Sequence, residues 1–514
     1  YARLLCLPPP PGIRPERWQQ IIDDGGRFLD EWADKANRLG WTTLEVFGIS
    51  PRAPEHRLDM RGLVPALGGH RIVMLTAEAA ISDNQTWTDL GCYGHPLVKT
   101  PNIDRLASEG VRFEHGFATT ASCGPSRAVM YTGLLTHSNG QYAHPHREHN
   151  QQLREDVTSV FAMLKNAGYR TGLIGKDHIK PLEKYPIDFK PRLSSRDVAA
   201  MAGAAGSFLK ESDDPFFLVL SFSDPHPVSI DGKGWGIREP VKGYDPILYD
   251  PAEVPVPPFL PDTRQVREGI AGYYQQISRM DYGVGLVLKA LRESGHENET
   301  LVIFISDHGT SEPGAMGTHY EPGVRVPFIV KQPGLKNPAT PNRALVAFTD
   351  LTPTILDWTG TTFDDYPLHG RSLLPVLSDP DPEGWDEVLL SHVGHDIFAY
   401  YPMRTLRQRD FKLIWNVTPG AEYPLPIDTV QRETWIQLRA RGDEMIGGRS
   451  VEDFLHRPRL ELYDLRNDPW ETKNLADDPS HAAQLDEMLS RLMARLEAQE
   501  DPWIRKFHPL SREQ

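Results

Sequence analysis

Two uninterrupted apolar runs most constrain the fold of this chain. Residues 216–222 read Phe-Phe-Leu-Val-Leu-Ser-Phe, and residues 301–305 read Leu-Val-Ile-Phe-Ile. The first run is followed by Asp-Pro-His at 224–226 and the second by Ser-Asp-His-Gly at 306–309. Continuous apolar runs bounded by turns are typical of strands that are buried on both faces of a mostly parallel sheet. Open α/β sheets place their sites just beyond the carboxyl ends of the strands, so we expect a functional site there.

The surrounding sequence alternates between strand and helix patterns. Residues 71–76 and 170–174 read as further buried strands, and residues 100–110 and 157–167 read as helices. This alternation predicts an α/β fold with a central, mostly parallel sheet flanked by helices.

Three segments of the chain differ in character. Residues 1–70 stand apart, with a proline run followed by an amphipathic helical pattern, and residues 71–380 carry the α/β pattern. Residues 381–514 contain short strand patterns around 404–416 and a final helical pattern at 481–499. We therefore predict an atypical N-terminal segment, a catalytic domain and a smaller C-terminal α+β subdomain.

Composition excludes several classes of protein. The 514 residues carry a formal charge of −15, which argues against a nucleic-acid-binding protein because such proteins present a basic face. No apolar run approaches the ~20 residues needed to span a bilayer. The three cysteines do not make a disulfide framework. No signal peptide is visible, and the chain begins with Tyr1, so the sequence does not predict a location.

The string Cys-Gly-Pro-Ser-Arg at 123–127 concentrates chemical groups at a predicted helix start. Cys123 is a nucleophile, and Arg127 lies four residues later on the same helical face. The free N–H groups and the dipole of a helix N-terminus favour an anion. The alternative is a buried structural cysteine before an ordinary helix.

Polar residues after three predicted strands add further candidates. Asp307 and His308 suit a divalent cation, although a strand-end turn with a capping aspartate would look the same. Lys176 could neutralise an oxyanion, and His178 and His226 could transfer protons. Taken singly, each of these three is a weak signal that a solvated loop or a structural histidine would also produce.

The string from Cys123 to Gly133 resembles the type I sulfatase signature C-x-P-S-R-x-x-x-x-T-G at every fixed position. The order of the other candidates resembles sulfatases of the alkaline-phosphatase superfold over roughly residues 86–505. Further strings resemble the heparan N-sulfatase (sulfamidase, N-sulfoglucosamine sulfohydrolase) branch: Tyr-Pro-Ile-Asp-Phe at 185–189, Arg-Met-Asp-Tyr-Gly at 279–283, Asp-Leu-Thr-Pro-Thr at 350–354, Gly-Arg-Ser-Leu-Leu-Pro at 370–375, Tyr-Pro-Met-Arg at 401–404, Pro-Ile-Asp at 426–428 and Glu-Leu-Tyr-Asp at 461–464.

This resemblance implies a mechanism. Cys123 would be oxidised to formylglycine by a maturation enzyme, and the hydrated aldehyde would attack sulfur with the help of a divalent metal, calcium by resemblance. Arg127 and Lys176 would stabilise the sulfuryl oxygens, His226 would protonate the leaving group, and His178 would help to release sulfate. The substrate implied is a sulfated glycan of the N-sulfoglucosamine type. The family also admits a homodimer and a secreted, periplasmic or lysosomal location.

Two positions depart from the family pattern. The first strand of the family ends in two adjacent aspartates that bind the metal, whereas this chain has Ala77 and Glu78. Loss of a carboxylate should weaken a site for a hard cation, with Glu78 as the remaining ligand there. The family also has Lys or Arg near the position of Met316, for which His319 is the nearest substitute as a substrate-binding residue.

Two other functions fit the same residues. A phosphate or phosphonate monoester hydrolase on this fold would also use the Asp-His-Gly string. A catalytically impaired sulfatase would retain the fold without turnover, because the aspartate pair is absent. Residues 1–70 have no counterpart in the family and suggest a fusion or a foreign extension that replaced its first strand.

Overall fold

The computed structural model describes residues 70–77, 85–145, 149–227 and 240–507 of the chain. They belong to one compact unit, Arg61–Gln514. The atypical N-terminal segment predicted at 1–70 lies outside the described residues except for its last residue, and Glu78 also lies outside them. The division of the chain at residues 70 and 380 stays a prediction.

A mixed, mostly parallel sheet of eight strands forms the centre of this unit, which confirms the predicted fold class. The strand order is β3-β4-β1-β5-β7-β2-β6, and β8 pairs with β2 in parallel. The four strands β3, β4, β1 and β5 are parallel neighbours. The strands are β1 (Arg71–Ala77), β2 (Val111–Phe117), β3 (Arg170–Gly175), β4 (Phe216–Phe222), β5 (Thr300–Ser306), β6 (Arg325–Val326), β7 (Phe328–Lys331) and β8 (Pro341–Ala347).

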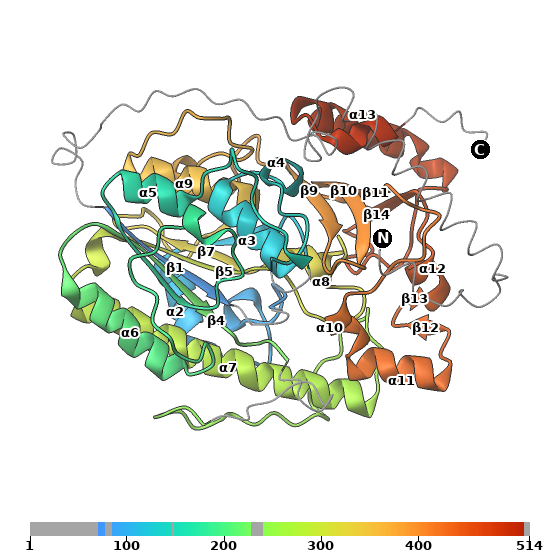
Figure 1. Ribbon diagram of the computed structural model, residues 1–514. Coiled ribbons are helices and arrows are strands. Elements are labelled where there is room, and N and C mark those ends of the chain that lie inside the picture. Colours follow the sequence, from blue (N-terminus) through green and yellow to red (C-terminus); the bar gives the residue numbers. More distant parts are fainter. Residues whose placement is uncertain (1–69, 78–84, 146–148, 228–239, 508–514) are drawn as a thin grey trace, which may run out of the picture. The chain divides into compact units, whose positions relative to one another are not determined.

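Both faces of the sheet are covered by helices (Figure 1). In β4, Phe217 and Val219 belong to one apolar cluster, whereas Leu218 and Leu220 belong to the other. Because successive side chains alternate between faces, a strand covered on both sides must be apolar throughout. One cluster includes α3 (Cys123–Thr132), α5 (Val160–Asn166) and α9 (Leu351–Thr359); the other includes α2 (Pro101–Glu109), α6 (Val198–Glu211) and α7 (Arg264–Glu293).

The register of the parallel strands brings four strand ends together. Ala77, the last residue of β1, pairs with Phe222 of β4 on one side and with Ser306 of β5 on the other. Gly175 of β3 pairs with Ser221 of β4. The polar residues that follow these strands therefore begin at one edge of the sheet, where α/β proteins place their sites.

A second, antiparallel sheet forms most of the C-terminal region, in the order β14-β11-β10-β9. The long helix of this region packs Met488, Leu492 and Leu496 against it. The elements are β9 (Glu387–Gly394), β10 (Tyr400–Gln408), β11 (Phe411–Asn416), α10 (Ile427–Val430), α11 (Glu433–Arg441), β12 (Met445–Ile446), β13 (Arg449–Ser450), α12 (Val451–Leu455), β14 (Leu460–Asp464) and α13 (Ala482–Ala498). Two short helices, α4 (Thr136–Asn139) and α8 (Glu321–Val324), complete the set. None of the helices in the described residues combines the length and the apolar character that crossing a membrane requires.

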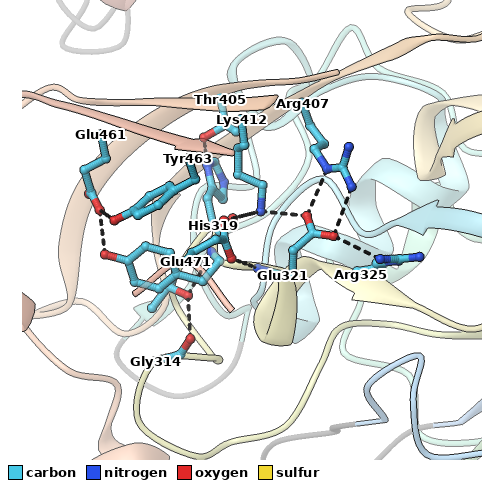
Figure 2. A network of polar contacts seen from close by, with 12 residues as sticks. Gly314, His319, Glu321, Arg325, Thr405, Arg407, Lys412, Glu461, Tyr463 and Glu471 are labelled. Carbon is cyan, nitrogen blue, oxygen red and sulfur yellow. Dashed lines mark hydrogen bonds and ion pairs between the residues drawn. The ribbon is translucent and has the colours of Figure 1, made fainter. Parts of the chain in front are cut away.

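A buried ionic network joins α8 to the second sheet (Figure 2). Lys412 Nζ lies 2.8 Å from Glu321 Oε1 and 2.7 Å from Glu471 Oε1. Arg407 donates to both oxygens of Glu321, at 3.1 and 3.3 Å. Burial alone would raise the pKa of Glu321, but the positive charges of Arg407 and Lys412 hold that pKa well below its ordinary value. Burial raises the pKa of Glu471 to about 7. The network therefore depends on its cations.

We expect Lys412→Met to destabilise the protein by about 3–5 kcal/mol, because it leaves two buried carboxylates without their shared cation. The matched control is Lys289→Met, which removes an exposed i,i+4 pair with Glu293 at 3.7 Å and should cost less than about 1 kcal/mol. Urea unfolding followed by fluorescence measures both. Equal losses in the two variants would contradict this account of the network.

Candidate active site

The helix α3 begins at Cys123, as the sequence predicts, and all ten of its residues are buried. Ser122 precedes it in an extended conformation. The Cys123 sulfur lies 3.3 Å from Nε2 of His308, which follows β5. The start of α3 therefore places the Cys123 sulfur next to the residues that follow β5.

Asp307 and His308 form the second component of the site, and both are fully buried. Asp307 Oδ1 accepts the N–H of His308 at 2.9 Å, and the carbonyl oxygen of Asp307 accepts the hydroxyl of Ser126 at 2.6 Å. Oδ2 of Asp307 has no hydrogen-bond partner among the described residues. A buried carboxylate oxygen without a donor is expensive, so a cation at this point would compensate for it.

The orientation of the His308 ring follows from its neighbours. Its Nδ1 lies 2.9 Å from the carbonyl oxygen of Gly309 and therefore carries the proton. The Nε2 lone pair then faces Cys123. Burial lowers the pKa of His308, although Asp307 acts in the opposite direction. The ring is consequently neutral near pH 7 and available as a ligand.

Ligand atoms of Cys123, Asp307 and His308 all lie within 4.8 Å of one another. A carboxylate with an unpaired oxygen and a neutral imidazole are a suitable donor set for a divalent cation. Glu78, which the sequence predicts as a further ligand, lies outside the described residues, but its neighbour Ala77 pairs with Ser306 beside Asp307. The residues present therefore fit a cation at this position.

Asp89 is a buried carboxylate that could be considered as a further metal ligand, but it is already hydrogen-bonded. Its Oδ2 accepts the hydroxyl of Tyr273 at 2.7 Å. Burial raises the pKa of Asp89 to about 6, which weakens it further as a charged ligand.

Arg127 connects the helix start to two strands. Its Nη2 donates to the hydroxyl of Ser221 in β4 at 2.6 Å, and its Nη1 donates to the carbonyl oxygens of Lys176 and Asp177 at 3.2 and 3.1 Å. The guanidinium is almost completely buried. A buried cation at a helix start favours an anion next to it.

Lys176 and His178 follow β3 and reach the same region. Lys176 is buried, and its charge lowers the pKa of both His226 and His308, which places the three groups within electrostatic reach of one another. His178 has a positive φ of 44° and donates its N–H to Asp177 Oδ1 at 2.6 Å. Non-glycine residues in this conformation gather at functional sites.

His226 follows β4 and is buried. Its Nδ1 contacts the carbonyl oxygen of Pro227, so the proton of the neutral ring resides there. Its Nε2 has no hydrogen-bond partner in the described part of the chain. Burial, together with the charges of Arg196 and Lys176, holds the pKa of His226 well below its ordinary value.

Comparisons with known proteins give the family of this chain. The sequence model of the Sulfatase family matches residues 79–361, and the model described as "N-sulphoglucosamine sulphohydrolase, C-terminal" matches residues 316–425. The human N-sulphoglucosamine sulphohydrolase is 36% identical over 446 residues, which span 80% of this chain and 88% of that protein. The chain belongs to the sulfatase family. It is therefore a hydrolase of that family, as the sequence predicts.

One further sequence relative and two solved structures of similar fold are more distant. An ulvan-active sulfatase of Formosa agariphila is 29% identical over 82% of this chain and 80% of that protein. A structure solved with its substrate, D-glucosamine-2-N,6-O-disulfate, has a TM-score of 0.60 at 19% identity and covers 84% of this chain and 98% of the other. The phosphonate monoester hydrolase of Agrobacterium radiobacter has a TM-score of 0.62 at 20% identity, covering 84% and 96%.

Sequence reasoning missed the residues that hold the His226 turn of this sulfatase. Arg279 donates to both oxygens of Asp224, at 2.6 and 2.8 Å, and Arg196 donates to Asp224 Oδ1 at 2.9 Å. Gln276 donates to the carbonyl oxygen of His226 at 2.8 Å. Asp224 and Arg279 both lie within strings quoted above, but nothing in those strings indicates that they pair.

His319 lies among the residues of the second sheet. Its Nδ1 lies 2.7 Å from the hydroxyl oxygen of Thr405, and burial lowers its pKa well below the ordinary value (Figure 2). Its Nε2 is buried without a hydrogen-bond partner among the described residues. Met316 is also buried. A role for His319 in substrate binding stays a prediction.

We expect Gly309→Ala to destabilise the protein by more than about 1–3 kcal/mol, the usual cost of overpacking. A Cβ atom at Gly309 would lie 1.7 Å from the carbonyl oxygen of Pro322, so the loop that carries Asp307 and His308 would have to move. Gly203→Ala is the matched control because a Cβ there meets nothing within 4 Å on the helix α6, and it should be stabilising by about 0.5–1 kcal/mol. Thermal unfolding measures both. An unaffected Gly309→Ala protein would contradict the packing described for this loop.

Proposed function

We propose that this chain is a formylglycine-dependent sulfatase that removes sulfate from N-sulfoglucosamine-type glycans. The observation that carries the proposal is the meeting of the buried Cys123 sulfur with His308 at 3.3 Å, at the start of a helix whose Arg127 is also buried. The 36% identity to the human N-sulphoglucosamine sulphohydrolase and the match to its C-terminal domain support the substrate class.

Two groups would be added to this chain for catalysis. Formylglycine made from Cys123 by a maturation enzyme would supply a hydrated aldehyde whose oxygen attacks sulfur and later releases it as sulfate. A divalent cation, calcium in this proposal, would supply Lewis-acid polarisation of a sulfuryl oxygen. Asp307 and His308 would hold this cation, with Glu78 as the expected further ligand.

Arg127 and Lys176 would bind the sulfuryl oxygens. Both side chains are buried, so their charges act through little water and attract an anion strongly. The contacts of Arg127 with Ser221 and the carbonyl oxygens of Lys176 and Asp177 fix its position before substrate arrives. Such preorganisation stabilises charge without reorganisation during the reaction.

His226 would protonate the departing amine from Nε2. In the protein without substrate the depressed pKa keeps this ring neutral, with its proton on Nδ1. A bound sulfuryl group is negative and would raise the pKa of His226, because an adjacent opposite charge favours the imidazolium. His178 would accept a proton when sulfate is released.

The departures from the family pattern bear on the strength of this activity. With Ala77 in place of a metal-binding aspartate, the site has fewer negative ligands for a hard cation. A catalytically impaired sulfatase is therefore the second reading of the same site. By resemblance to the family, the proposal also includes a homodimer and a secreted, periplasmic or lysosomal location.

Peptide mass spectrometry over residues 112–127 tests the modification. Conversion of Cys123 to formylglycine should lower the peptide mass by about 18 Da, because oxygen replaces a thiol and a hydrogen. The converted protein should release sulfate from N-sulfoglucosamine, and Cys123→Ala should not. An unmodified thiol in an actively hydrolysing preparation would refute the mechanism.

The same preparation separates the alternative functions. Phosphonate monoester hydrolases share this fold, so turnover of an aryl phosphate or phosphonate should be compared with that of N-sulfoglucosamine. Faster phosphonate turnover would favour the alternative. Full conversion of Cys123 without turnover of either substrate would indicate the impaired sulfatase.

The depressed pKa of His226 predicts how kcat/KM changes with pH. If the protonated ring is required, kcat/KM should still be rising as the pH falls past about 6.5, the ordinary histidine value, because the depressed pKa of His226 delays its protonation in the free protein to more acidic pH. In the complex the bound anion raises this pKa, so kcat should level off at a higher pH than kcat/KM. His226→Gln should lower kcat by about 10²–10⁴-fold and remove this dependence.

His369→Gln is the matched control for this experiment. Burial lowers the pKa of His369 to about 4, its Nδ1 accepts the N–H of Leu135 at 3.2 Å, and its ring lies 5.6 Å from that of His137. This variant should keep the wild-type pH profile. A His226→Gln profile that still rises toward acid would remove His226 from the proton transfer.

A further inference from the structure

A second cluster of buried ligand-type side chains lies beside His178. The ring of His144 packs against that of His178 edge to face, with centroids 5.4 Å apart. On its other side, Nε2 of His144 lies 3.0 Å from Nε2 of His395. Ligand atoms of His144, His395 and Asp396 all lie within 4.8 Å of one another, and the three residues are buried. None of them takes part in the sulfate chemistry proposed above.

We propose that His144, His395 and Asp396 bind a transition-metal ion of the zinc class, separate from the cation at Asp307. Zinc–nitrogen bonds of about 2.0–2.1 Å place two ring nitrogens of a tetrahedral site about 3.3 Å apart. The two Nε2 atoms lie 3.0 Å apart, so a small rotation of the rings would bring them to that spacing. Neutral imidazoles select zinc, nickel, cobalt or copper over calcium and magnesium, which prefer oxygen ligands.

The backbone holds the two histidines in this relation. The N–H of His144 donates to the carbonyl oxygen of His395 at 3.1 Å. A tight turn follows, in which the N–H of His395 donates to the carbonyl oxygen of Ala399 at 3.2 Å and the N–H of Ala399 donates to that of Asp396 at 3.0 Å. The ligand atoms therefore converge without requiring a movement of the chain.

Neighbouring groups orient the carboxylate. Asp396 Oδ2 accepts the N–H of Ile427 at 3.0 Å, and Asp396 Oδ1 lies 3.5 Å from Nε2 of His149. Nδ1 of His149 accepts the N–H of Ile397 at 3.0 Å, so Nε2 of His149 is the nitrogen that donates toward Asp396. Supporting contacts of this kind are typical of metal ligands.

A second carboxylate balances the charge. Asp428 Oδ2 lies 3.4 Å from Nε2 of His395. The carboxylates of Asp396 and Asp428 would together balance the charge of a divalent ion, and His144, His395 and Asp396 would supply three of its ligands. The alternative is a hydrogen-bonded histidine pair without an ion, in which one Nε2 proton is shared between His144, His395 and Asp428.

Zinc binding to the full-length Cys123→Ser protein tests the proposal. This variant removes the soft thiolate of the other cluster, so zinc that binds tightly must be held elsewhere. Isothermal titration with zinc chloride, in buffer containing calcium, should show one zinc ion per chain. The X-ray absorption spectrum of the zinc-loaded protein should show two nitrogen ligands at about 2.0 Å.

Variants in the same Cys123→Ser background locate the ion. His395→Gln and Asp396→Asn should each weaken zinc binding by more than about tenfold, since even residues that only support metal ligands cost this much. His296→Gln is the matched control: His296 is buried, its Nε2 lies 3.8 Å from a carboxylate oxygen of Asp213, and zinc affinity should be unchanged.

The shift of the thermal unfolding midpoint on addition of zinc tests binding even in a variant that is less stable than the parent protein. Zinc should raise the unfolding midpoint of the Cys123→Ser and His296→Gln proteins and not that of His395→Gln, because an ion that binds only the folded chain stabilises it. Undiminished zinc affinity in His395→Gln and Asp396→Asn would overturn the proposal. So would the absence of zinc binding in Cys123→Ser, which would assign the ion to the cluster of Cys123, Asp307 and His308.

Discussion

The site depends on the parallel register of β4, β1 and β5. Because Ala77 lies level with Phe222 and Ser306, residues that follow three different strands begin at one edge of the sheet. The buried helix α3 is held against that edge through two of its side chains. Ser126 donates to the carbonyl oxygen of Asp307, and Arg127 donates to Ser221. A change in this register would separate the Cys123 sulfur from His308 and would also remove the support of Arg127.

Burial determines which groups at this edge are charged. Burial lowers the pKa of His226 and His308, so neither of these imidazoles contributes a positive charge near pH 7. The positive charge at the site comes instead from Arg127 and Lys176, in a chain whose formal charge is −15. This division suits a site that must first attract an anion and then provide a proton. The anion itself supplies the field that would protonate His226.

Local sequence could predict the sheet and the catalytic candidates because the information is local. An apolar run reports burial on both faces, and the string from Cys123 to Arg127 contains a nucleophile and a cation within one helical turn. The pairs that support the site were not predictable in this way. Asp224 and Arg279 are 55 residues apart, and His144 and His395 are 251 residues apart. Lys412 lies in the strand β11, whereas Glu321 lies in the helix α8. Such pairs form only in the folded protein, so the spacing of residues within one segment does not predict them.

The cluster of Cys123, Asp307 and His308 and the cluster of His144, His395 and Asp396 differ in the hardness of their ligand atoms. The absence of the aspartate pair therefore affects metal selectivity as well as the strength of calcium binding. With Ala77 at the end of β1, Asp307 is the described carboxylate of the first cluster, and its other donors are an imidazole and, before conversion, a thiol. That set is softer than one built on several carboxylates, so it discriminates less against zinc. In the proposed second site, His144 and His395 offer two imidazoles close by and would compete for the same ion. Conversion of Cys123 to formylglycine would remove the soft thiolate, which returns the first cluster to oxygen-rich ligation and leaves zinc to the histidines. Maturation of the cysteine would then set the nucleophile and also determine which metal occupies each cluster.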